Sequence, residues 1–65
     1  MNNITILFKD STTVTIRHAY QVVNDGELLT INYEECVDDE GYKVMTTDSA
    51  TFALDDIALI TNYEI

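Results

Sequence analysis

ITILFKDSTTVTIR, residues 4–17, is the stretch that decides the fold. In its first half Ile4, Ile6 and Phe8 fall on one side and Thr5, Leu7 and Lys9 on the other, which is the two-residue period of a β-strand. Asp, Ser and Thr at positions 10–12 favour a turn. Residues 13–17 then resume the alternation with β-branched side chains. The stretch therefore predicts a β-hairpin.

The alternation continues beyond residue 17. His18, Tyr20 and Val22 fall on the side already occupied by Val14 and Ile16. We therefore expect a second strand that is long and bent, with His18 half-buried or at a sheet edge.

Two further turn signals divide the middle of the chain. Asp25-Gly26 lies between apolar runs and predicts a type I′ turn, in which both central residues take positive φ. A strand over 28–33 follows, and the acidic, glycine-containing segment 38–41 is the next break. Residues 42–47 supply a fourth strand, so the pattern predicts a second hairpin.

The last third of the chain is less regular. Asp48-Ser49 should end the fourth strand, and 50–54 should form a short extended piece. Carboxylates at 55 and 56 precede an apolar run and suit the cap of one helical or 3₁₀ turn near residues 55–59. Uninterrupted strand over 59–63 is the alternative.

The expected fold class is all-β: one domain, residues 1–65, forming a small antiparallel meander. Leu7, Leu28 and Leu59 lie opposite the main apolar faces, so a flat sheet would leave them wet. A sheet that curls toward a small barrel, or one that dimerises, would bury more of them. The apolar spacing of residues 52–60 resembles the closing turn and last strand of SH3-like barrels. That resemblance covers most of the chain, concerns architecture and implies no activity.

Charge is distributed unevenly along the chain. Twelve acidic residues face three basic ones, and eleven of the twelve lie after Asn24, where Lys43 is the only cation. Such a chain repels polyanions and attracts basic surfaces. Direct nucleic-acid binding is therefore not expected, although four tyrosines could stack on bases.

The acidic residues around the second hairpin are the candidate partner-binding site. A folded surface with these carboxylates would mimic the charge of DNA and occupy the basic groove of a nucleic-acid-binding enzyme. The alternative is a solvated hairpin tip whose charges only keep a strand edge from aggregating. The candidate residues are Glu27, Glu34, Glu35, Asp38, Asp39, Glu40 and Asp48.

Metal and catalytic chemistry is not expected. If Gly41 were the sixth residue of a calcium loop, Cys36 and Thr47 would stand where the anchoring ligands belong. One cysteine and one histidine are too few for a zinc site. A nucleophilic pair of Cys36 and His18 would also need an orienting group and an oxyanion site, which no motif indicates. We therefore expect no enzyme activity, no cofactor and no metal.

Location is predicted from three absences in the sequence. Cys36 has no partner for a disulfide, Met1 is followed by polar residues instead of a signal peptide, and no apolar run approaches the roughly 20 residues of a membrane span. We expect a cytoplasmic protein without membrane contact, in a bacterial host if a phage encodes it.

Small size, acidity and a compact β pattern together resemble phage-encoded inhibitors of bacterial defence or nucleic-acid enzymes, including anti-CRISPR proteins. The resemblance is one of class, without a diagnostic motif. It implies a non-enzymatic protein that docks an acidic surface onto a basic partner. The alternative is a small structural or accessory phage or bacterial subunit, a homo-oligomer joined through its apolar faces, such as a homodimer.

Overall fold

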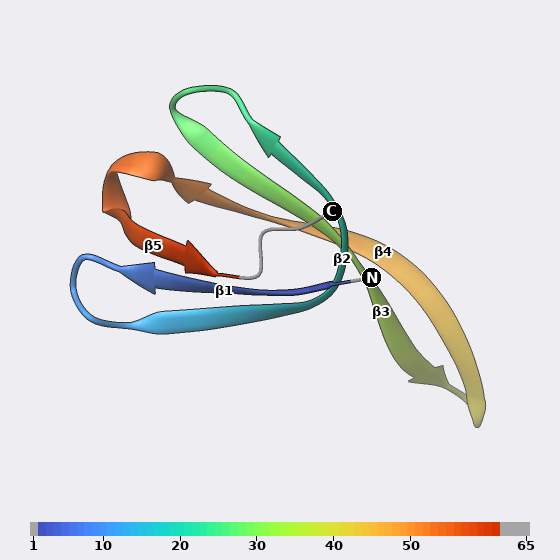
Figure 1. Cartoon of the computed structure of the whole chain (residues 1–65). Helices are drawn as coiled ribbons and strands as arrows, with labels where there is room; N and C mark the ends of the chain where they lie inside the picture. Colours follow the sequence, from blue (N-terminus) through green and yellow to red (C-terminus); the bar gives the residue numbers. More distant parts are fainter. Residues whose placement is uncertain (1, 62–65) are drawn as a thin grey trace.

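The computed structural model describes residues 2–61 and consists almost entirely of antiparallel strands (Figure 1). The predicted all-β meander with one short helical turn is confirmed. Among the described residues, no helix has the length and apolar character needed to cross a membrane. The elements are β1 (Asn2–Phe8), β2 (Thr13–Asn24), β3 (Leu28–Asp39), β4 (Tyr42–Ala53), the 3₁₀ turn η1 (Leu54–Asp56) and β5 (Ile57–Thr61).

The strands form one sheet in the order β4-β3-β2-β1-β5, and η1 connects its two edge strands. In a flat sheet these edges would lie about 19 Å apart, whereas the four residue steps from Ala53 to Ile57 reach at most about 14 Å. The sheet must therefore curl. The rings of Phe8 and Phe52, from the non-neighbouring strands β1 and β4, accordingly lie 5.5 Å apart between centroids.

The core lies inside this curl. Ile4 and Ile6 of β1 and Leu29 and Ile31 of β3 have no exposed surface, as their alternation requires. Ile16 and Ala19 of β2 complete the fully buried cluster. Half-buried apolar side chains from all five strands and η1 surround it. The core is small, as expected for a chain of 65 residues.

The long, bent second strand is confirmed, but the predicted facing of its middle part is wrong. His18 takes a φ of 60°, and the pairing of β2 shifts register between Ala19 and Gln21. Such irregularities bend a strand and break its alternation. Ala19 is consequently buried in place of Tyr20, which is 42% exposed. His18 is exposed and has no partner in the described ladders, which agrees with a histidine at a sheet edge and not with a half-buried one.

The type I′ turn occurs in the second hairpin and not at Asp25-Gly26. Gly26 has positive φ but Asp25 does not, and Asp25 accepts hydrogen bonds at Oδ1 from the backbone N–H groups of Glu27 (2.9 Å) and Leu28 (2.7 Å). Because the Asp25 carboxylate accepts these two N–H groups, the connection does not adopt the two-residue type I′ turn. Glu40 and Gly41, with φ of 51° and 87°, form the type I′ turn between β3 and β4.

The second hairpin is much longer than predicted. β3 runs to Asp39 instead of residue 33, and β4 continues through Asp48-Ser49, which was expected to end it. The unbroken ladder of twelve residue pairs overrides the weak strand preference of these polar residues.

The predicted short turn lies slightly earlier than expected, at Leu54–Asp56. Its N-cap is Ala53, without a side-chain cap, and Asp55 and Asp56 lie within the turn instead of preceding it. The strand after it begins at Ile57, and the remainder of the alternative strand over 59–63 lies outside the described residues beyond Thr61.

Candidate functional site: an acidic arm

The second hairpin projects beyond the curled sheet as an arm (Figure 1). β2 pairs with β3 only as far as Ala19 opposite Tyr33, whereas β3 and β4 stay paired up to Asp39 opposite Tyr42. Residues 34–47, here named the arm, therefore form a two-stranded ribbon. Every residue from 35 to 47 is exposed, and Glu34 at the base is half-buried.

The carboxylates of the arm lie on both faces of the ribbon. Leu29 and Ile31 face the core, so alternation carries Glu35 and Asp39 onto the continuation of the core face. Glu34 and Asp38 take the other face by the same alternation. Lys43 lies directly opposite Asp38 in the ladder. Both faces of the arm are thus negatively charged, and Lys43 is its single cation.

Asp48 lies at the base of the arm, directly opposite Tyr33 in the ladder. The pKa of the Tyr33 hydroxyl is raised above its ordinary value of 10.0, first by desolvation and then by the charges of Asp48 and Glu35. Asp48 and Glu35 therefore act together on Tyr33 at the base of the arm.

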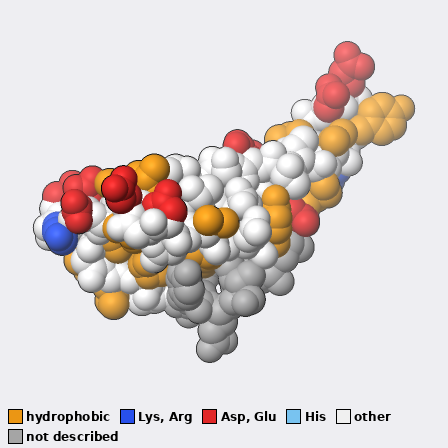
Figure 2. Space-filling view, turned by 90° about the horizontal axis from the view of Figure 1, so that it is seen from above, with side chains coloured by type: hydrophobic (Ala, Val, Ile, Leu, Met, Phe, Trp, Pro, Cys, Tyr) orange, Lys and Arg blue, Asp and Glu red, His pale blue; other side chains and the backbone are white. Residues whose placement is uncertain are grey.

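A second acidic group lies at the opposite end of the molecule, here named the loop end. It comprises the connections 9–12, 25–27 and 54–56. Two backbone hydrogen bonds of 2.9 Å draw these together, from Lys9 N–H to the Asp56 carbonyl and from Leu54 N–H to the Glu27 carbonyl. Figure 2 shows acidic side chains gathered at this end and again at the tip of the arm.

Six of the seven predicted site residues are brought together, and Glu27 is not. It precedes the first residue of β3, twelve residues from the tip of the arm, which corresponds to roughly 40 Å of strand. The molecule is itself 40 Å long. Glu27 lies instead with the carboxylates of the loop end, namely Asp10, Asp25, Asp55 and Asp56.

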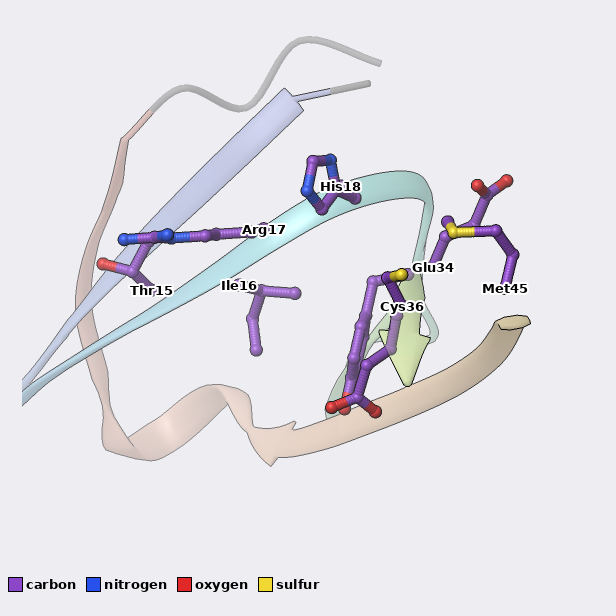
Figure 3. Close-up of a pocket in the computed structure, with 9 residues that line it drawn as sticks. Thr15, Ile16, Arg17, His18, Glu34, Cys36 and Met45 are labelled. Carbon is purple, nitrogen blue, oxygen red and sulfur yellow. The ribbon is translucent and has the colours of Figure 1, made fainter. Parts of the chain in front are cut away.

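A cleft of about 630 Å³, which the sequence did not reveal, opens where β2 leaves β3. Figure 3 shows Ile16 and the Cys36 sulfur on the same side of the β2 ribbon, and the ring of His18 projecting to the other. The sequence held no signal for it, because the alternation of apolar residues continues past His18, and the bend of β2 depends on the backbone of His18 and on a register shift against β3. The lining residues are Thr15, Ile16, Arg17, His18, Tyr33, Glu34, Glu35, Cys36 and Met45.

Within the described part of the chain, no three His, Cys, Asp or Glu side chains are placed to hold a metal ion together. Asp10 and Asp25, two carboxylates that accept more than one hydrogen bond from nearby residues, belong to turns. Asp10 accepts from the backbone and hydroxyl of Thr12, and these bonds lower its pKa. The two backbone N–H groups bound to Asp25 lower its pKa in the same way, that of Leu28 most strongly.

No protein-family model, curated protein or solved structure matches this chain. Its function must therefore be argued from the shape and charge of the molecule.

Proposed function

We propose that this protein is a non-enzymatic inhibitor that docks its acidic arm onto the basic nucleic-acid-binding surface of a partner protein. The supporting observation is the arm itself, which extends away from the core and carries several carboxylates with Lys43 as its single cation. In this it resembles phage-encoded inhibitors of nucleic-acid enzymes, including anti-CRISPR proteins. Glu27 is left out of the proposed site because it lies at the loop end.

The spacing of the charges supports mimicry of one nucleic-acid strand. Residues of a strand rise about 3.3 Å each, so Glu34 to Glu40 span about 20 Å. Five carboxylates lie within that span. One strand of DNA carries a charge about every 3.4 Å, which gives about six charges over the same length. With Lys43 included, the arm carries a net charge of −4 over this span, which is about two thirds of the charge of one strand and about one third of that of a duplex.

Regular pairing of the arm supports the same proposal. Its ladder runs without a bulge from Glu34 opposite Thr47 to Asp39 opposite Tyr42, and a type I′ turn joins the two strands. A paired backbone holds the carboxylates at a regular spacing, so binding costs less conformational entropy than it would for an unstructured tail. Their field also accelerates encounter with a basic partner, and salt should weaken this effect.

One observation favours the alternative of a homo-oligomer. Leu7 and Leu59 are paired across β1 and β5, and Leu59 is 54% exposed. An interface built there would cover this pair and leave the arm free. Light scattering on the purified protein, repeated with Leu59→Ser, tests this. Loss of an oligomer in that variant would establish the alternative, and a monomeric parent protein would exclude it.

The docking proposal is tested by removing charge from the arm. The arm variant combines Glu35→Gln, Asp38→Asn and Asp39→Asn, all at exposed positions. Purified bacterial nucleases and polymerases are passed over the immobilised protein and eluted with salt or double-stranded DNA. Three rim carboxylates at roughly 0.5 kcal/mol each predict about a tenfold loss of affinity for any retained enzyme.

A matched control removes the same charge from the loop end, with Glu27→Gln, Asp55→Asn and Asp56→Asn. Both variants have three fewer negative charges than the parent value of −9, so their long-range attraction is similar. We expect the control to bind like the parent protein and DNA to displace both. Equal losses in the two variants, or retention that DNA does not disturb, would contradict docking through the arm.

A further inference from the structure

We propose that the cleft between β2 and the arm receives an extended basic segment of the partner protein, which adds as a β-strand to the edge of β3 that no other described strand occupies. This inference rests on the proposed function, because it specifies which part of a basic partner the arm engages. The cleft supplies the backbone contacts and the carboxylates of the arm supply the charge.

The cleft lies between strand edges and not on a sheet face. Side chains on one face of a strand come from alternate residues. The lining, however, takes consecutive residues from both strands: positions 15–18 of β2 and positions 33–36 of β3. A space bordered in this way is a wedge between two strands that diverge, with backbone on either side.

Both borders of the wedge have unused pairing capacity among residues 2–61. Thr13–Ile16 of β2 pair with β1, and residues 34–39 of β3 pair with β4. On the side facing the wedge, neither run pairs with another described strand. Alternate N–H and C=O groups of an edge strand point away from its neighbour and form a template for an added strand.

Charge and polarity define the segment that would fit. Beyond the base, Glu34 and Asp38 flank the β3 edge on one face and Glu35 and Asp39 on the other. An added strand sends successive side chains to opposite faces, so basic residues opposite the two pairs of carboxylates would face them directly, and basic residues opposite Cys36 and Val37 would reach the same carboxylates diagonally.

The closed end of the wedge has a different character. Ile16 and Tyr33 offer apolar surface near it, whereas Asp38 and Asp39 lie five and six residues from Tyr33, toward the tip. The half of the segment that reaches this end should therefore be uncharged and apolar. An arm from a second copy of the protein would not fit, because its own carboxylates would meet these.

The test uses a synthetic peptide with four lysines in its N-terminal half and valine and threonine in its C-terminal half. This order suits antiparallel addition to β3, because β3 runs from the closed end toward the tip. Two further peptides carry N-methyl groups on the backbone nitrogens of alternate residues: one peptide at the odd positions and the other at the even positions. Methylation keeps the charge and removes the N–H donors. Binding is followed by fluorescence anisotropy, and the contacted residues by amide NMR shifts.

The expected result is that the unmethylated peptide binds and shifts amides at 15–18 and 33–38, and that one methylated peptide binds about tenfold or more weakly. Equal binding of all three peptides, or no binding of the first, would overturn strand addition. The arm variant with Glu35→Gln, Asp38→Asn and Asp39→Asn separates the two proposals. If it binds the peptide as tightly as the parent while methylation still weakens binding, the charge-docking proposal fails, and strand addition survives without the requirement that the segment be basic.

Discussion

The loop end and the arm are both acidic, but their carboxylates have different surroundings. At the loop end, Asp10 and Asp25 accept backbone hydrogen bonds that shape the turns after β1 and β2. In the arm, the carboxylates of residues 34–40 form no hydrogen bond with other described residues and sit on a ribbon without buried side chains. The comparison teaches that Asp10 and Asp25 stabilise the fold, whereas the carboxylates of the arm are available to a partner.

The largest expected effect concerns packing. Ile31→Ala should lower the free energy of unfolding by about 2–5 kcal/mol, because Ile31 is fully buried in the curl. Val37→Ala lies in the exposed part of the same strand and should lower the free energy of unfolding by less than about 1 kcal/mol. Urea denaturation measures both. Similar losses would mean that the arm is packed against something and not exposed.

The next effect concerns the two kinds of carboxylate. Asp25→Ala removes the acceptor of two backbone hydrogen bonds and should lower the thermal midpoint. Asp39→Ala in the arm should leave the midpoint unchanged or raise it, because it relieves repulsion between like charges. Calorimetry at neutral pH compares the two. The comparison fails if the arm variant is the less stable one.

Acid should affect the loop end in a defined direction. The pKa values of Asp10 and Asp25 are lowered in the folded protein from their ordinary value of 3.8. Their contribution to stability is therefore full above pH 3.8 and is lost as the pH falls through the lowered folded values. Urea midpoints between pH 6 and 2 should show this loss, and Asp25→Asn should reduce it. An unchanged acid dependence in that variant would contradict the assignment.

The smallest expected effect lies at the bend of β2, where the two regions meet. His18 has a φ of 60°, which is unfavourable for residues other than glycine. His18→Gly should therefore raise stability by up to about 1 kcal/mol. Arg17→Gly is the control and should lower stability, because its backbone is ordinary strand. If both glycines destabilise equally, the bend is not held under strain.

The sequence predicted the parts of the fold that depend on local alternation. Ile4 and Ile6 are buried as their period requires, and the break before Ile57 contains the expected short turn. The turn types could not be read from Asp-Gly and Glu-Gly, because the Asp25 side chain competes for the backbone N–H groups that decide the geometry. The bend at His18 depends on a register shift between strands, which single-strand periodicity does not contain.

The candidate site was predicted only in part. Neighbouring carboxylates between Glu34 and Glu40 had to stay close, since five of them fall within one hairpin. Glu27 was assigned to the same surface because it precedes that hairpin in sequence, but β3 carries the tip away from it. Arg17 and Cys36 line one cleft because β2 leaves β3 beyond the pair of Ala19 and Tyr33, and no spacing in the sequence encodes that divergence.

The central claim is that a basic macromolecule meets the arm and not the loop end. Amide NMR spectra recorded while a decamer of lysine is added test it directly, since the probe carries charge without a preferred fold. The account predicts shifts concentrated in residues 34–48 that disappear at high salt. Shifts concentrated in 9–12, 25–27 and 54–56, or spread evenly over both ends, would contradict it.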